Sequence, residues 1–172
     1  TLDLEIAPDL PNALFDGDAL DQILDNLLDN AEKHTRGVTE RRVHITATHD
    51  DDWLRIEVAD NGPGIDSEDL RHIFEPFHSS KGQGGTGLGL AVARKIVHEH
   101  HGRIDVSSMP GEGTIFRVRL SIAEAGPYES EETFGPVAAV VIGVNVGTAG
   151  WFGAAVGTVL LSAGAVGVSQ PP

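Results

Sequence analysis

Every charged residue of the chain lies within its first 132 positions, and this split constrains the fold more than any other feature of the sequence. The 172 residues include 12 Lys or Arg and 26 Asp or Glu; the last of them is Glu132, so residues 133–172 carry no charge. The charged part is long enough to bury one hydrophobic core. We therefore predict a folded domain over residues 1–122, an acidic linker over residues 123–136 and a charge-free tail rich in Gly, Ala and Val over residues 137–172.

The composition excludes several functional classes. The formal net charge of −14 disfavours a protein that binds nucleic acid through the phosphate backbone, because such a protein needs a basic surface. The absence of cysteine excludes disulfides, thiolate catalysis and thiolate zinc sites, and it agrees with a cytoplasmic location. Residues 1–6 alternate like a strand and show no targeting signal, and the missing initiator Met leads us to expect a piece of a longer protein.

The spacing of apolar residues predicts an α+β domain with one sheet covered by helices. Helices are predicted over residues 18–34, 67–74 and 90–101. Alternating residues predict a strand over residues 1–6 and two hairpins, over residues 43–58 and 103–120. Asp66 is the expected cap at the start of the second helix, and Gly102 is the expected cap at the end of the third.

Four polar side chains share one face of the first predicted helix. Asn26, Asn30, Lys33 and His34 are spaced at i, i+4, i+7 and i+8. Amide oxygens are suitable ligands for Mg²⁺, which takes oxygen donors together with phosphate and water. Lys33 is a candidate for contact with a phosphate group. A solvated helix face carrying the same residues is the alternative.

A second motif follows the first predicted hairpin, where residues 60–65 read Asp-Asn-Gly-Pro-Gly-Ile. The Asp60 carboxylate only accepts hydrogen bonds, so it suits the amino group of adenine and repels the carbonyl group of guanine. Gly62 and Gly64 would let the backbone approach such a base. A turn closed by a capping carboxylate is the alternative.

Two further segments are adjacent in the chain. Residues 74–81 read Phe-Glu-Pro-Phe-His-Ser-Ser-Lys, which suits either two core phenylalanines or the hinge of a lid that carries Lys81 to a phosphate. Residues 82–90 read Gly-Gln-Gly-Gly-Thr-Gly-Leu-Gly-Leu and run into a helix, so their backbone N–H groups form a candidate anion site. This pattern is neither the dinucleotide fingerprint nor a P-loop, and a flexible linker is the alternative.

Together and in this order, the four segments resemble the N box, the first glycine box, the F box and the second glycine box of sensor histidine kinases. The segments read Asn-Leu-Leu-Asp-Asn-Ala-Glu-Lys-His-Thr, Asp-Asn-Gly-Pro-Gly-Ile, Phe-Glu-Pro-Phe and Gly-Thr-Gly-Leu-Gly-Leu, and the resemblance spans roughly residues 1–122. It implies the catalytic ATP-binding domain of the gyrase, Hsp90, histidine kinase and MutL superfamily. The implied fold is a two-layer α/β sandwich with a mixed sheet covered on one face by helices, and with ATP between the helices and a lid.

The resemblance also implies roles for individual residues. Asn30 would be the principal Mg²⁺ ligand, Asn26 would support it, and Lys33 and Lys81 would contact phosphate. The other residues implied to bind ATP are His34, Asp60, Gly62, Gly64, Ile65, Phe77, Gly85, Thr86, Gly87, Leu88 and Gly89. Among these, His34 would lie beside the adenine, Asp60 would hold its amino group, and the last glycines would line the triphosphate.

One departure from the superfamily pattern favours a kinase over an ATPase. In members that hydrolyse ATP, a Glu four residues before the magnesium Asn activates water, and Asn26 stands at that position in this sequence. The sequence holds no histidine in the His-Asp/Glu-x-x-x-Pro setting of phosphoacceptor histidines. The implied partner is therefore a histidine-containing dimerisation domain in cis or in trans, with a response regulator downstream. The alternative is an anti-sigma-factor-like serine kinase, or a nucleotide-dependent binding module, on the same fold.

The charge-free tail allows two interpretations. Residues 137–168 are long enough to span a bilayer and contain small residues at four-residue spacing. No Lys or Arg flanks the stretch, however, and Trp151 lies in its middle rather than at an interface. A poorly ordered tail is the favoured expectation. Contact with a membrane is expected only through this tail or through a part that precedes the chain.

Overall fold

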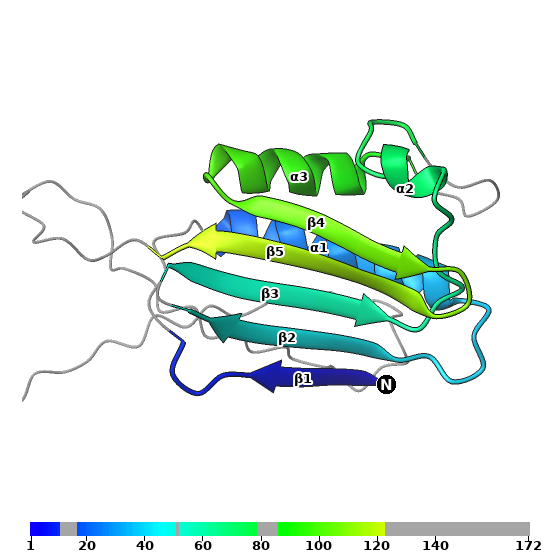
Figure 1. Ribbon diagram of the computed structural model, residues 1–172, viewed down its shortest axis with the longest axis horizontal. Coiled ribbons are helices and arrows are strands. Elements are labelled where there is room, and N and C mark those ends of the chain that lie inside the picture. The colour runs from blue at the N-terminus through cyan, green and yellow to red at the C-terminus, as the bar shows by residue number, and fades with distance from the viewer. Residues whose placement is uncertain (11–16, 51, 79–85, 123–172) are drawn as a thin grey trace, which may run out of the picture.

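A five-stranded sheet with helices packed on it forms the described part of the chain, which comprises residues 1–10, 17–50, 52–78 and 86–122 of the computed structural model (Figure 1). The strands are β1 (Leu2–Ile6), β2 (Val43–His49), β3 (Trp53–Asp60), β4 (Arg103–Met109) and β5 (Gly113–Ser121). The helices are α1 (Gly17–Thr35), α2 (Asp69–His72) and α3 (Gly89–Glu99).

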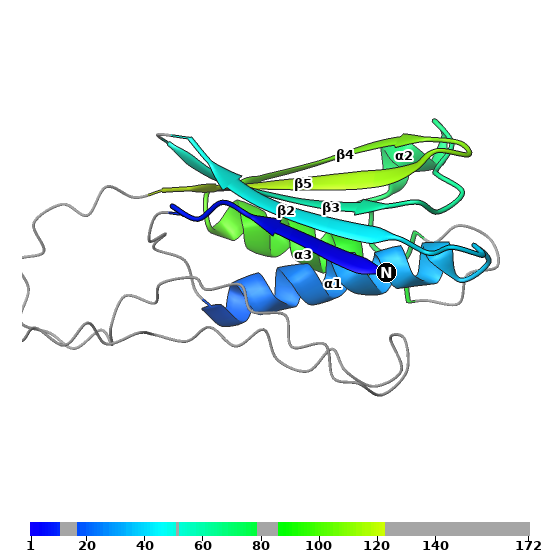
Figure 2. The same cartoon turned by 90° about the horizontal axis from the view of Figure 1, so that it is seen from below.

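The sheet is mixed, with the strand order β1-β2-β3-β5-β4. β1 runs parallel to β2, whereas the β2/β3, β3/β5 and β4/β5 pairs are antiparallel. Figure 2 shows α1 and α3 on the same face of the sheet. This arrangement confirms the predicted α+β fold with a mixed sheet covered on one face by helices.

The core lies between the sheet and the two long helices. Alternate residues of each central strand are buried, as in Leu54, Ile56 and Val58 of β3, because successive side chains of a strand point to opposite faces. The largest buried side chain is Phe116 of β5. Each fully buried aliphatic or aromatic side chain contributes about 1.5–3 kcal/mol to folding.

The apolar stripe of α1 determines which way its polar residues point. Buried residues recur at three- and four-residue steps along the helix; they are Leu20, Ile23, Leu24, Leu27, Leu28, Ala31 and Thr35. This stripe packs on the sheet, so the polar face of α1 is turned away from the strands. The predicted helix over residues 18–34 is therefore confirmed.

The ends of the two shorter predicted helices differ from expectation. α2 is confined to Asp69–His72, so it is shorter than the helix predicted over residues 67–74. The Asp66 carboxylate accepts hydrogen bonds from the Glu68 and Asp69 backbone N–H groups, each at 2.9 Å. At the end of α3, Gly102 is not the residue in the left-handed conformation, because His101 adopts φ 57° instead. Gly102 is buried, and a Cβ atom there would lie 2.6 Å from the carbonyl oxygen of Arg119. Gly102 is thus explained by close packing on β5.

The predicted linker and tail, residues 123–172, lie outside the described residues, and their boundaries stay predictions. Within the described ranges, no helix combines the length and the apolar character needed to cross a membrane.

Candidate functional site

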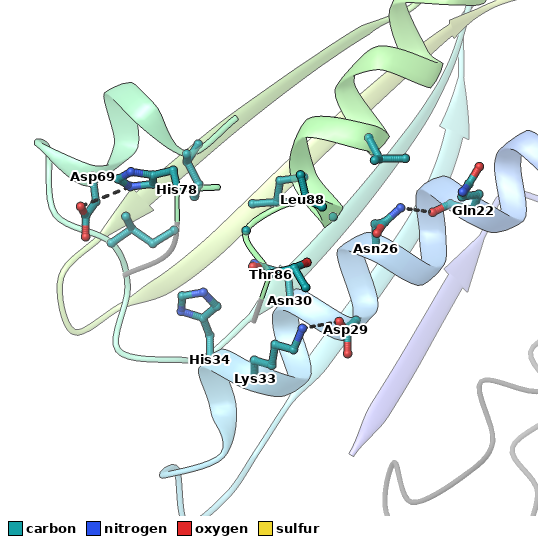
Figure 3. A pocket seen from close by; sticks show the side chains of 16 residues that line it. Gln22, Asn26, Asp29, Asn30, Lys33, His34, Asp69, His78, Thr86 and Leu88 are labelled. Atoms are coloured by element: carbon teal, nitrogen blue, oxygen red, sulfur yellow. Dashed lines mark hydrogen bonds and ion pairs between the residues drawn. The ribbon is translucent and has the colours of Figure 1, made fainter. Parts of the chain in front are cut away.

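A cavity of about 300 Å³ opens between α1, the segment around α2 and the start of α3 (Figure 3). α1 contributes Gln22, Asn26, Asp29, Asn30, Lys33 and His34 to its wall. The segment around α2 contributes Ile65, Asp69, Ile73 and His78, and the start of α3 with the residues before it contributes Thr86, Gly87, Leu88, Gly89, Leu90 and Val92. The cavity wall therefore contains residues of all four segments singled out in the sequence.

The four polar residues of α1 that the sequence placed on one helix face all line this cavity: Asn26, Asn30, Lys33 and His34. Their common orientation follows from the buried stripe on the other side of the helix. A solvated helix face, the alternative interpretation, does not describe these side chains, since each of them is only partly exposed and faces the cavity.

The side chain of Asn26 lies against the first residue of α3. Its Nδ2 donates a hydrogen bond of 2.7 Å to the backbone carbonyl of Gln22. Its Oδ1 faces Gly89, where a Cβ atom would lie only 2.8 Å away. A larger residue at position 89 would displace this amide, so the first and the last of the four motifs meet at a direct contact.

Two buried polar atoms on the cavity wall, Asn30 Nδ2 and His34 Nδ1, have neither a hydrogen-bond nor an ion-pair partner among the described residues. Leaving a buried polar group without a partner costs about 1–3 kcal/mol. Such groups are expected where a polar ligand supplies the missing partner. The donor set of amide nitrogens and oxygens, an ammonium group and imidazoles suits a ligand that carries both a heterocycle and phosphate groups, and the amide oxygens suit Mg²⁺.

The surroundings of His34 favour the neutral form of its imidazole. Burial, and secondarily the neighbouring Lys33 ammonium group, lower its pKa from the ordinary value of 6.5. A neutral imidazole donates one hydrogen bond and accepts another, and it adds no charge next to an aromatic base.

Asp60 lies at the end of β3 and is only 7% exposed. Its Oδ1 accepts a hydrogen bond of 2.8 Å from the Gly62 backbone N–H group, and burial raises its pKa to about 6. The structure does not bring Asp60 into the wall of the cavity described above. It is linked to that wall through Gly62, because a Cβ atom on Gly62 would meet both the Asp60 Oδ1 and the His34 carbonyl oxygen, at 2.7 and 3.0 Å.

A second cavity of about 640 Å³ adjoins the first at the end of α1. Lys33 and His34 line both cavities, and Gly62 lines the second. Residues of the first glycine box therefore line the second cavity, and Lys33 and His34 lie between this cavity and the first.

Gly64 is required by the packing of the loop on the β4–β5 hairpin. It adopts φ 73°, and a Cβ atom there would lie 2.0 Å from the Met109 carbonyl oxygen. The next residue, Ile65, is buried and donates its backbone N–H to Ser108 Oγ at 2.8 Å. Of these two, only Ile65 lines the cavity, and a contact of Gly64 with a ligand stays a prediction.

The two phenylalanines of residues 74–81 behave differently. Phe74 is partly buried and makes an edge-to-face contact with Phe116, with ring centroids 6.2 Å apart. Phe77 is 77% exposed and has φ 64°, so the expectation of two core phenylalanines is wrong for this residue. Phe77 does not line the cavity, and its role in ATP binding stays a prediction.

The third and fourth motifs are joined by the backbone. The Phe77 N–H group donates a hydrogen bond of 2.9 Å to the Gly87 carbonyl oxygen. Gly87 has φ 67°, and a Cβ atom there would lie 2.7 Å from the His78 carbonyl oxygen. The chain ends that enclose residues 79–85 therefore lie side by side at the cavity. Lys81 and Gly85, both predicted site residues, fall outside the described residues.

Four polar residues of the wall were not identified from the sequence as site residues: Gln22, Asp29, Asp69 and His78. The i,i+4 spacing of Asp29 and Lys33 is a signal that could have revealed Asp29, since their side chains form an ion pair with Oδ2 and Nζ 2.5 Å apart. His78 Nε2 lies 3.4 Å from Asp69 Oδ1, and no local spacing rule predicts that contact.

Comparison with known proteins assigns the family. The family of histidine kinase-, DNA gyrase B-, and HSP90-like ATPases matches residues 15–124, which is more than half of the chain. The chain belongs to this family. It is a histidine kinase-like ATPase domain, homologous to the catalytic domains of sensor histidine kinases.

Similar sequences are those of sensor kinases. The chain is 37% identical over 123 residues to the alginate biosynthesis sensor protein KinB of Pseudomonas aeruginosa, covering 71% of this chain and 20% of that protein. It is 41% identical over 127 residues to the sensory histidine kinase/phosphatase NtrB of Rhodobacter capsulatus, covering 67% of this chain and 35% of that protein. The histidine kinase-like domain thus spans about a third or less of the length of these relatives.

Similar solved structures give the same assignment. The catalytic domain of histidine kinase ThkA, in a nucleotide-free form, matches with a TM-score of 0.62 at 30% identity over 70% of this chain and 79% of that chain. Full-length ShkA in complex with AMPPNP matches with a TM-score of 0.64 at 32% identity over 74% of this chain and 27% of that chain. Because these proteins are histidine kinases, the anti-sigma-factor-like alternative is not favoured.

Proposed function

We propose that this histidine kinase-like domain binds ATP with Mg²⁺ in the cavity between α1 and α3 and transfers the γ-phosphoryl group to a histidine. The acceptor histidine would belong to a dimerisation domain, in cis or in trans. The observation that carries the proposal is the convergence on one cavity wall of two buried polar atoms, Asn30 Nδ2 and His34 Nδ1, that have no partner among the described residues.

The proposed roles follow from the chemistry of each group. The amide oxygens of Asn30 and, in support, Asn26 would hold Mg²⁺, which when bound neutralises charge on the phosphates. Lys33 would contact phosphate as a mobile cation. The backbone around Gly87 and Gly89 would add N–H donors at the start of α3.

The base would be held at the other end of the site. His34 would lie beside the adenine, and Asp60 would accept a hydrogen bond from its amino group, with Gly62 between them. By the resemblance alone, Lys81 and Gly85 would complete the phosphate site. The contribution of this chain to catalysis would be positioning and electrostatic stabilisation.

Transfer to a protein is proposed in preference to transfer to water. An amide does not accept a proton at neutral pH, so Asn26 cannot activate a water molecule from its place on the cavity wall. We propose a response regulator as the downstream partner and the cytoplasm as the location. Nucleic acid is not proposed as a partner, because the net charge is −14.

Incubation of the chain with γ-labelled ATP, Mg²⁺ and the dimerisation hairpin of a related sensor kinase tests the proposal. The expected product is an acid-labile, alkali-stable phosphohistidine on the hairpin. A hairpin whose histidine is replaced by alanine is the control and should stay unlabelled. An acid-stable phosphoserine, or release of inorganic phosphate without labelling, would contradict the proposed transfer.

A further inference from the structure

The ammonium group of Lys33 is already paired within its own helix. Lys33 Nζ lies 2.5 Å from Asp29 Oδ2, one turn earlier on α1, and both residues line the cavity (Figure 3). The Lys33 side chain is 28% exposed and that of Asp29 is 54% exposed. Lys33, the residue proposed to contact phosphate, is thus paired with the Asp29 carboxylate, which is itself exposed to solvent.

A phosphate group and the Asp29 carboxylate compete for the same cation. An ion pair this exposed contributes only about 0–1 kcal/mol, so it can be exchanged for a stronger pairing with a multiply charged ligand. The Asp29 carboxylate also repels a polyphosphate placed in the same cavity, because two like charges about 4 Å apart in water interact by about 1 kcal/mol. The ion pair is not needed to hold α1, which is anchored by its buried stripe.

We propose that Asp29 is a positioning residue that holds Lys33 when no nucleotide is bound and releases it to the phosphates when ATP binds. Asp29 then lowers the affinity for nucleotides in proportion to their phosphate charge. This inference rests on the proposed ATP-binding function and names a residue that sets the affinity of that site.

The same helix offers a matched control for this effect. Arg36 Nη2 and Glu32 Oε1 form a second i,i+4 ion pair at 3.4 Å. Glu32 lines neither of the two cavities. Asp29→Asn and Glu32→Gln each remove one negative charge from α1 and break one i,i+4 pair. Only the first change frees a cation that lines the cavity with Asn26 and Asn30, because Arg36 lines the second cavity instead.

Calorimetric titration with ATP, ADP and adenosine tests the inference. Asp29→Asn is expected to tighten ATP binding by about threefold to tenfold, corresponding to the loss of one ion pair and one repulsion. The gain should be smaller for ADP and below about twofold for adenosine, which carries no phosphate. Glu32→Gln is expected to change all three affinities by less than about twofold. If Asp29 had a purely structural role, the change in affinity caused by Asp29→Asn would not depend on the number of phosphates in the ligand.

A double-mutant cycle with Lys33→Met separates exchange of partners from simple repulsion. Lys33→Met should weaken ATP binding, and in that background the gain from Asp29→Asn should fall to less than about twofold. A gain that persists without Lys33, an unchanged affinity of Asp29→Asn, or a loss of Mg²⁺-dependent binding in that variant would each overturn the inference. Failure of the unmodified chain to bind ATP would instead overturn the proposed function, and with it this inference.

Discussion

Asn26 on α1 and Gly89 at the start of α3 are in direct contact. If residue 89 had a Cβ atom, that atom would lie only 2.8 Å from Asn26 Oδ1. Asn26 cannot easily move away, because its Nδ2 donates to the Gln22 carbonyl oxygen at 2.7 Å. The contact joins two motifs that are more than sixty positions apart in the sequence, and it leaves no room for a larger residue at position 89.

We expect Gly89→Ala to destabilise the domain by about 1 kcal/mol. Overpacking against Asn26 costs about 1–3 kcal/mol, and alanine recovers part of this through its higher helix propensity. Urea unfolding measures the change in free energy. In an Asn26→Ala background the clash is absent, so the same substitution should become neutral or stabilising by a few tenths of a kcal/mol. Equal destabilisation in both backgrounds would show that Asn26 is not the obstacle.

The pKa of Asp60 predicts a pH-dependent stability. Burial raises this pKa from 3.8 to about 6, so between these values the folded domain binds more protons at Asp60 than the unfolded chain. The free energy of unfolding contributed by Asp60 therefore falls as the pH rises from about 4 to 6 and then stays low. The shift corresponds to about 3 kcal/mol. Urea unfolding at pH 4, 5, 6 and 7 should show Asp60→Asn becoming more stable than the unmodified chain as the pH rises; a difference that does not vary with pH would contradict this.

Asp60→Asn should weaken ATP binding, although it is expected to stabilise the folded domain at neutral pH. Asn can still accept the Gly62 N–H hydrogen bond, but it replaces the second carboxylate oxygen by a donor that faces the adenine amino group. We expect Asp60→Asn to weaken ATP binding by roughly hundredfold or more, and binding by the unmodified chain to weaken as the pH falls below about 6. Calorimetry at pH 7 and pH 5.5 measures both effects. An affinity for ATP in Asp60→Asn like that of the unmodified chain would remove Asp60 from its proposed role.

The repeating patterns of the sequence predicted the elements well, because periodicity reports which face is buried. The stripe of α1 is one such pattern, and it also oriented Asn30 and Lys33 towards the cavity. The features that were missed depend on contacts between segments distant in sequence. The burial of Asp60 outside the cavity wall, the exposure of Phe77 and the close approach of Gly102 to β5 each depend on packing that no local pattern encodes.

Asn30 is expected to couple ATP binding to Mg²⁺. Its amide lines the cavity, and its Nδ2 has no hydrogen-bond partner among the residues that the structure describes. Asn30→Ala should abolish the tightening of ATP binding by Mg²⁺ while leaving the affinity measured in EDTA within about threefold. Titrations with and without the metal give both values. An unchanged response to Mg²⁺ would count against Asn30 as a ligand.

Gly64 in the first glycine box and Gly111 in the β4–β5 turn allow two costs in stability to be measured separately: that of a left-handed backbone conformation and that of close packing. Gly64 and Gly111 both have positive φ, 73° and 85°. A Cβ atom at Gly64 would lie 2.0 Å from the Met109 carbonyl oxygen, whereas one at Gly111 would meet no atom of the described residues within 4 Å. Gly111→Ala should therefore cost only the left-handed conformation, about 1–2 kcal/mol. Gly64→Ala adds displacement of the hairpin and should cost at least about 2 kcal/mol more. Urea unfolding compares the two, and equal costs would mean that the loop can move away from the β4–β5 hairpin without loss of stability.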